Sequence, residues 1–325
     1  MKTNLHYLDL KKEVLNKIRK NGGWVNAHSH FDRAYSLNEN NLKYVFRSLQ
    51  EKWDLNDELK RSSSVDDVYD RMATATESMI AQGVTAVGTF IDVDEAIEDK
   101  AIKAAQKLRE NYKNDITFRF INQVHKGVLD PMARKWFDVG AEFVDIIGGL
   151  PGKDKGHERQ HLDVLLSTAK KMNKMVHVHV DQLNTPSEKE TELLADKTIE
   201  YGMKNKVVGV HGISLAAHKK DYREKVYKKL HDAGVMMVAC PVGWIDHKRS
   251  EELLPWHNAL TPVEELIAHE VVVALGTDNI IDIYKPFADG EMWIELKLLL
   301  EGLHFYEIDE LVKIATVNGR KVLGI

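Results

Sequence analysis

The sequence predicts an α/β protein built as a single (β/α)8 barrel, and three features of the chain support this prediction. Eight short runs rich in β-branched and apolar residues recur along its 325 residues, helical patterns separate them, and glycines stand where a helix must give way to the next strand. Such alternation is typical of parallel strands joined by crossover helices. We expect residues 1–23 to form a helical extension and residues 24–325 to form the barrel.

The eight runs have starts roughly 25 to 36 residues apart, except for a gap of about 60 after the first. A strand, a helix and two loops need at least the shorter spacing. An open doubly wound sheet is the alternative, but no glycine-rich phosphate loop follows the first run, which favours the closed barrel. The runs are 24–31, 84–93, 117–124, 142–150, 175–182, 206–213, 235–243 and 271–280.

Helix boundaries are marked by capping residues and by glycines. Ser187, followed three residues on by Glu190, predicts a capping box, and Pro262 stands at the first position of a further helix. Helix candidates are 65–81, 95–112, 158–172, 187–203 and 219–233. Glycines that follow a helical pattern and precede a strand predict left-handed C-caps. They are Gly83, Gly140, Gly202 and Gly234.

Composition narrows the classes of function. The chain has 45 Lys and Arg against 50 Asp and Glu, a net charge of -5, and no basic run that would favour nucleic acid. It has no run of 18 apolar residues, so no membrane span is expected. Cys240 is the only cysteine, which excludes an intramolecular disulfide and suits a reducing cytoplasm. The sequence favours a cytoplasmic protein that acts on a small molecule, and it leaves a homo-oligomer open.

Polar residues gather toward the C-terminal ends of the runs, where (β/α)8 enzymes place their chemistry. His28 and His30 are two apart, so both side chains face the same side of the first strand and can reach one ion. Any one such residue has an ordinary explanation as a satisfied core histidine or a strand-end cap. Four strands that aim imidazoles and a carboxylate at one end would bear a desolvation cost without a reason, so we expect a metal site. The later runs contribute His177, His179, Asp181, His211 and Asp278.

This pattern resembles the amidohydrolase superfamily over nearly the whole chain: His-x-His on the first strand, a histidine on each of the fifth and sixth, and an aspartate after the eighth. The local strings are most similar to the cytosine deaminase branch, which includes hydrolases of N-alkylated triazine rings. No lysine ends the fourth run, where binuclear members carry one, so the resemblance implies a single ion. The strings are NAHSHFDR at 26–33, VHVDQ at 178–182, VHGISLAAH at 210–218, ACPVGWIDHKR at 239–249 and GTDNIIDIYKP at 276–286.

The resemblance also implies a role for each residue. One divalent ion, Zn2+ or Fe2+, would be held by His28, His30, His179 and Asp278, with His177 placed deeper in the barrel or behind a ligand. Asp278 would take a proton from the attacking water, and His211 would stabilise charge on the attacked group. The implied reaction is hydrolysis of a C–N bond, by deamination or dealkylamination, in a small nitrogen heterocycle or cyclic amide, with hydroxide supplied by the metal.

Gln182 departs from the family pattern, because cytosine deaminases carry there a glutamate that shuttles protons to the ring nitrogen. Glutamine keeps the hydrogen-bonding shape but does not titrate. Two alternatives therefore stay open, a reaction like that of the triazine hydrolases and a catalytically impaired barrel that binds metal or ligand. A scaffold without metal is a third class.

Three further residues match substrate contacts of the family. They are His125, Tyr284 and Arg33, for which a loop histidine, a packing aromatic and a surface arginine are the alternatives. Residues 32–64 form a long connection, rich in aromatic residues such as Trp53, and we expect it to cover the site as a lid. The flanks of this barrel are not expected to build the small β-sandwich that family members usually carry.

Overall fold

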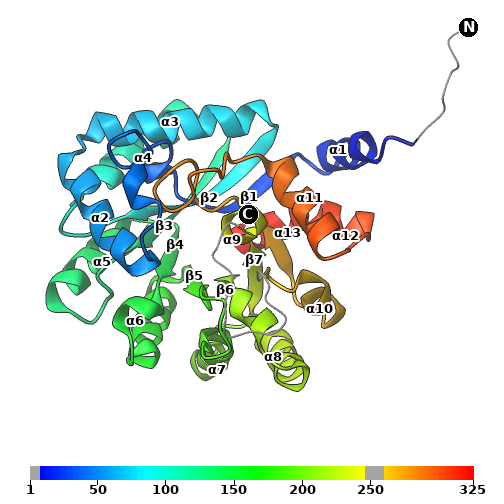
Figure 1. Ribbon diagram of the computed structural model, residues 1–325. Helices are drawn as coiled ribbons and strands as arrows, with labels where there is room; N and C mark the ends of the chain where they lie inside the picture. The colour runs from blue at the N-terminus through cyan, green and yellow to red at the C-terminus, as the bar shows by residue number, and fades with distance from the viewer. Residues whose placement is uncertain (1–7, 246–259) are drawn as a thin grey trace, which may run out of the picture.

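The core of the protein is one sheet of eight parallel strands in chain order (Figure 1). The computed structural model describes residues 8–245 and 260–325. Backbone N–H groups of Thr277 and Asp278 donate to the carbonyl oxygen of His28 at 3.0 Å, which joins the segment after the last strand to the first. The predicted (β/α)8 barrel is confirmed. The strands are β1 (Trp24–Ser29), β2 (Val84–Asp92), β3 (Thr117–Gln123), β4 (Ile146–Gly149), β5 (Met175–Val180), β6 (Val207–His211), β7 (Met236–Ala239) and β8 (Val273–Leu275).

Helices surround the sheet as an outer layer (Figure 1). The predicted helices 65–81 and 158–172 are observed with those bounds, as α3 (Val65–Ala81) and α6 (Glu158–Met172). The other helices are α1 (Leu10–Lys20), α2 (Leu49–Ser62), α4 (Lys100–Asn111), α5 (Pro131–Phe143), α7 (Glu190–Tyr201), α8 (Lys220–Ala233), α9 (Pro241–Ile245), α10 (Val263–Ala268), α11 (Met292–Gly302), α12 (Ile308–Ala315) and α13 (Val317–Leu323). Short 3-10 turns include η1 (Phe31–Arg33), η2 (Leu42–Tyr44), η3 (Pro151–Asp154) and η4 (Ile213–Ala217).

The strands are apolar on both faces because both faces are covered. One face packs against the helices, and the other meets the apolar centre of the barrel, where Phe90, Ile121 and Ile146 are fully buried. β1 is buried at every position. The interior is therefore a packed core rather than a pore, and it supports the polar side chains at one end.

Asp181 caps α7, and the predicted capping box of Ser187 and Glu190 was wrong. The Asp181 carboxylate accepts the backbone N–H groups of Glu190 at 2.7 Å and Thr191 at 3.2 Å. The Glu190 carboxylate in turn accepts the Asp181 N–H at 3.1 Å. The first N–H groups of the helix thus find their acceptor nine residues upstream.

Gly140 lies inside α5 and is not a left-handed cap. A Cβ there would approach the Cβ of Asn122 to 3.0 Å, so close packing of α5 on β3 explains the glycine. The predicted left-handed caps at Gly83, Gly202 and Gly234 are confirmed by φ values of 82°, 65° and 64°. Pro262 precedes α10 as its N-cap rather than standing at its first position.

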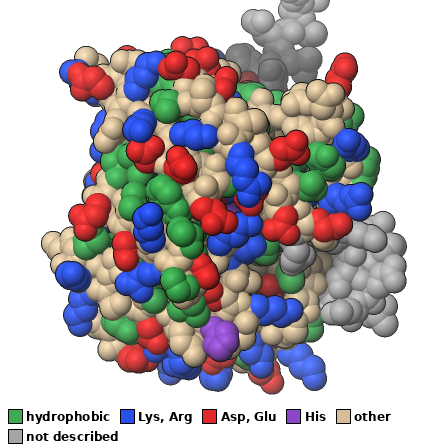
Figure 2. Space-filling model, turned by 90° about the vertical axis from the view of Figure 1, so that its left-hand side faces the viewer, with side chains coloured by type: hydrophobic (Ala, Val, Ile, Leu, Met, Phe, Trp, Pro, Cys, Tyr) green, Lys and Arg blue, Asp and Glu red, His purple; other side chains and the backbone are tan. Residues whose placement is uncertain are grey.

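The outer surface carries charges of both signs. Figure 2 shows acidic and basic side chains interspersed over the face that lies at the left of Figure 1, where α2, α4 and α5 are found. α1 packs beside α12, and Lys17 pairs with Asp309 at 2.5 Å. Among the described residues, no helix is both long and apolar enough to cross a membrane.

Candidate metal centre

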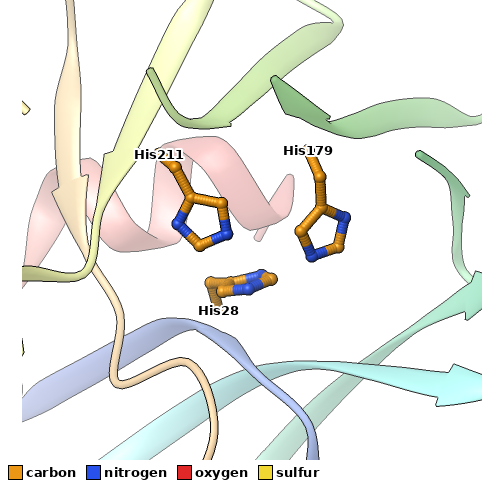
Figure 3. A group of neighbouring side chains, drawn as sticks. All are labelled: His28, His179 and His211. Atoms are coloured by element: carbon orange, nitrogen blue, oxygen red, sulfur yellow. The ribbon is translucent and has the colours of Figure 1, made fainter. Parts of the chain in front are cut away.

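Four ends of strands bring five polar side chains together at one end of the barrel. His28 lies on β1 and His30 just after it, His179 on β5, His211 at the end of β6, and Asp278 three residues beyond β8. Figure 3 shows His28, His179 and His211 turned toward one another from three strands. Their ligand atoms lie within 4.8 Å of one another, and so do those of His28, His30 and Asp278. The structure therefore gathers the four predicted ligands and the predicted catalytic histidine into one cluster.

The contacts inside the cluster are short enough for one ion to bridge them. Oδ1 of Asp278 lies 3.3 Å from Nε2 of His28 and 3.3 Å from Nε2 of His30. Nε2 of His179 lies 3.4 Å from Nε2 of His30. Nδ1 of His179 lies 3.3 Å from the carbonyl oxygen of Gly149, a contact that places the ring proton on Nδ1 and leaves Nε2 to face the cluster.

Two residues of the cluster have an unusual backbone conformation. His211 and Asp278 have φ values of 78° and 59°, in the left-handed region that side-chain-bearing residues rarely adopt. Such strain is typical of functional sites, where the surrounding structure enforces it. Gly276 brings the chain close to β1, because a Cβ there would lie 2.7 Å from the Cβ of His28.

Burial fixes the charge of the cluster. It lowers the pKa of His30 to about 3, with the Arg33 cation adding to the effect. Burial likewise holds the pKa values of His179 and His211 well below the ordinary value, so these two imidazoles are neutral. Burial alone would raise the pKa of Asp278, but the neighbouring His28 and His30 nitrogens outweigh it and keep that pKa well below its usual range.

The donor set fits a divalent metal ion. Nδ1 and Nε2 of His28 and Nδ1 of His30 are buried and have no hydrogen-bond partner among the described residues. Buried polar atoms normally have a partner, so these nitrogens point to a ligand. Neutral imidazoles and an ionised carboxylate are the forms that bind Zn2+ and similar ions. The cluster could hold one metal ion.

His177 lies outside the cluster, deeper in the barrel. Its side chain is fully buried, and Nε2 lies 2.8 Å from the carbonyl oxygen of Val322, where it can donate a hydrogen bond. This contact belongs to the end of the chain at α13 rather than to the metal centre. The expectation of a deeper position is thus met in the structure.

A cavity of about 40 Å3 adjoins the cluster. Its lining includes the other predicted site residues, Gln182, His125, Tyr284 and Arg33. Arg33 is 6% exposed, so it is not a surface arginine. Its guanidinium lies 5.1 Å from the centre of the Tyr284 ring. Leu49, Trp53, Gln123, Leu150, Asn279 and Lys285 also line the cavity, together with His30, His179, His211 and Asp278.

The expected lid is partly helical. Residues 32–64 contain α2, whose first turn is fixed by a capping box between Ser48 and Glu51. Leu49 and Trp53 on α2 line the cavity beside the metal cluster. This helix is therefore part of the cavity wall, and its role as a lid stays a prediction.

Asp92 and Lys60 are two buried residues near the cavity that were not predicted from the sequence. Asp92 ends β2 and lies 2.9 Å from the Lys60 ammonium, 3.4 Å from Arg33 and 3.5 Å from His125. Its neighbours His125, Lys60 and Arg33 hold the pKa of Asp92 below its usual range despite its burial. The rule that singled out histidines at strand ends would have found Asp92, because it is the next-to-last residue of the second run.

The chain belongs to the amidohydrolase family, which it matches over residues 22–325. It is 55% identical over 266 residues to an uncharacterized protein of Haemophilus influenzae, a match that covers 81% of this chain and 96% of the relative. It is 23% identical to the N-isopropylammelide isopropyl amidohydrolase of a Pseudomonas species over 93% of this chain and 74% of that enzyme.

Among solved structures, a 5-methylcytosine deaminase of Klebsiella pneumoniae with bound 5-fluorocytosine superposes with a TM-score of 0.86. The alignment covers 93% of this chain and 74% of the deaminase at 22% identity. At that identity the likeness shows a shared fold. The protein is thus an amidohydrolase-fold hydrolase with a buried His/Asp cluster typical of a metal site.

Proposed function

We propose that this protein hydrolyses a C–N bond in a small nitrogen heterocycle or cyclic amide, by deamination or dealkylamination, with one divalent metal ion. The observation that carries the proposal is the cluster of four histidines and one ionised carboxylate at the C-terminal end of the barrel, in which burial lowers the pKa values of His30, His179 and His211. Zn2+ and Fe2+ both suit this donor set. We assign His28, His30, His179 and Asp278 as the ligands.

The residues of the cluster have different roles in the proposed reaction. His28, His30, His179 and Asp278 would hold a divalent ion, which would supply a nucleophilic hydroxide at neutral pH. Asp278, ionised and 4% exposed, would accept a proton from the attacking water. His211, held neutral, donates its ring N–H to the ring substituent at which negative charge develops. The water oxygen forms a new C–O bond to the attacked carbon, the proton taken by Asp278 passes to the leaving nitrogen, the C–N bond breaks, and ammonia or an amine departs.

The walls of the cavity suit a flat polar ring. Tyr284 offers an aromatic ring, and the Arg33 guanidinium and the His125 imidazole offer hydrogen bonds to ring oxygens or nitrogens of a substrate. Relatives support the substrate class, since one is a 5-methylcytosine deaminase and another an N-isopropylammelide isopropyl amidohydrolase. We assign Arg33, His125 and Tyr284 as substrate contacts.

Gln182 is the reason for a second candidate function. It lines the cavity, and the resemblance to cytosine deaminases implies at this position a glutamate that moves a proton to a ring nitrogen, which an amide cannot do. A barrel that binds metal and a heterocycle without turning it over is therefore the second candidate. The two differ in turnover and not in binding.

Metal analysis followed by a substrate screen tests the proposal. Purified protein is loaded with Zn2+ or Fe2+, and release of ammonia and of alkylamines is measured with pyrimidines, triazines and cyclic amides. Turnover of one of these that disappears in Asp278→Asn and His211→Asn supports hydrolysis. Metal-loaded protein that binds rings and releases neither product supports the binding alternative.

A further inference from the structure

We propose that Asp92 is a positioning residue that couples the closure of α2 to the placement of Arg33 and His125 in the cavity. The inference rests on the proposed function for its catalytic consequence, but not for its structural part. It assigns a role to a carboxylate that contacts neither the metal cluster nor, in our proposal, the substrate.

The two carboxylate oxygens of Asp92 face opposite sets of partners. Oδ1 lies 3.4 Å from Nη1 of Arg33 and 3.5 Å from Nε2 of His125, and both of these residues line the cavity. Oδ2 lies 2.9 Å from Nζ of Lys60 and 3.4 Å from Nδ2 of Asn56, both on α2. Asp92 is 2% exposed, so these contacts are shielded from water. One side chain thus joins the lid helix to the cavity wall.

Two buried carboxylates hold Lys60 at the contact between α2 and Asp92. Its side chain is 4% exposed, and its ammonium also lies 2.6 Å from Oδ2 of Asp94. A buried ammonium is costly unless carboxylates meet it, and it finds them at the end of β2 and in the segment that follows. Displacement of α2 would separate these charges, so the pairs favour the closed position.

The helix face that carries Lys60 also closes the cavity. Leu49, Trp53, Asn56 and Lys60 follow one another at spacings of four, three and four residues, which places them on one face of α2. Leu49 and Trp53 line the cavity, while Asn56 and Lys60 reach Asp92. Movement of the helix as a unit would therefore change both the cavity wall and the Asp92 junction.

The lining of the cavity would allow such a movement. The space beside the metal cluster is small, about 40 Å3, and Leu49, Trp53 and Gln182 line it. The same three residues also line a neighbouring pocket of about 490 Å3. Outward motion of Leu49 and Trp53 would join the two spaces. Closure over the ring would then restore Lys60 to Asp92 and fix Arg33 and His125.

Hydrogen exchange of the metal-loaded protein tests the coupling without any need for a substrate. The variants are Lys60→Met and Asp92→Asn, and the matched control is Lys197→Met. Lys197 is a second buried lysine, paired with Asp163 at 2.6 Å and Glu200 at 2.9 Å on the outer helices, away from the cavity. The exchange rates of α2 and of the segments around Arg33 and His125 are compared.

We expect both variants to speed exchange in α2 and in the Arg33 and His125 segments by about tenfold, while Lys197→Met leaves all three unchanged. A local effect confined to α2, or equal effects of Lys60→Met and Lys197→Met, would overturn the coupling. If Asp92→Asn does not fold, Lys60→Met and its control still decide the question, because they leave both aspartates in place.

Kinetics on a ring substrate from the screen provide the second measurement. Lys60→Met and Asp92→Asn should raise KM about tenfold, with metal content and the pH profile of kcat unchanged, because ring placement is lost and the metal cluster is not. A loss of metal in either variant would mean that Asp92 acts through the cluster, which contradicts the proposal. If no ring is turned over, the proposed function fails while the exchange result still stands or falls by itself.

Discussion

Oδ1 of Asp278 lies 3.3 Å from Nε2 of His28, although one residue follows the last strand of the barrel and the other lies on the first. The contact exists because the barrel closes: Asp278 also donates its backbone N–H to the carbonyl oxygen of His28 at 3.0 Å. The contacts that close the sheet therefore also bring together residues of the candidate metal centre.

Replacement of this carboxylate should abolish turnover. In Asp278→Asn the amide has almost the same shape but cannot accept the proton, and it is a weaker metal ligand. We expect kcat to fall by about 10² to 10⁴, with reduced metal affinity measured by competition with a chelator. Wild-type rates in Asp278→Asn would exclude Asp278 as the proton acceptor.

Two histidines on β5 should behave differently when each is replaced by alanine. His179→Ala removes a donor from the cluster and should lower the metal content of purified protein. His177→Ala removes a buried hydrogen bond to Val322 and leaves a cavity, so it should destabilise the fold by about 2 to 4 kcal/mol while metal content stays at the wild-type level. Metal analysis and denaturant unfolding measure the two effects. Equal metal loss in both variants would contradict the separation between them.

Gln182→Glu should add a titrating group to the cavity wall. A carboxyl there can carry a proton to a ring nitrogen, so we expect deamination of pyrimidines to rise by about tenfold or more. The pH profile of kcat should gain a limb that the wild type lacks. If Gln182→Glu and Gln182→Ala give the same rates, proton transfer at this position does not limit the reaction.

Glu190 should make the fold less stable at alkaline pH. Burial, with the nearby Asp181 and Glu188 charges, raises its pKa from 4.5 to about 8. Between these values the folded chain keeps a proton that the unfolded chain has released, so stability falls as pH rises through this window. In Glu190→Gln the amide oxygen still accepts the Asp181 N–H but does not titrate. The Tm of the variant should decline less than that of the wild type between roughly pH 5 and pH 9, and parallel Tm curves would refute the assignment.

The barrel and the metal cluster could be predicted because two regular features of parallel strands can be recognised in short stretches of sequence. Alternation along a strand places His28 and the residue two positions on toward the same side, and parallel strands end at the same edge. The same rule failed at Asp181, which alternation groups with His179. β5 ends at Val180, and Asp181 has a φ of 51°, so its carboxylate turns to the start of α7.

The contacts between α2 and Asp92 join residues far apart in the sequence, so no local sequence pattern predicts them. Sequence showed a long connection with aromatic residues, but not which helix face Lys60 occupies or that it reaches Asp92 across 32 positions. Burial of charged residues was equally hidden. The sequence left a surface arginine open as the alternative at Arg33, whereas in the structure Asp92 and Asp282 lie beside its guanidinium. Long-range ion pairs are decided by tertiary packing, which composition and spacing do not fix.

The central claim is that His28, His30, His179 and Asp278 hold one divalent ion. A crystal structure with anomalous diffraction measured at the metal absorption edge tests it most directly. We expect one anomalous peak per chain, within coordination distance of the imidazole nitrogens and of the Asp278 carboxylate. Metal-replete protein whose ion lies elsewhere, or whose cluster shows no anomalous peak, would contradict the account.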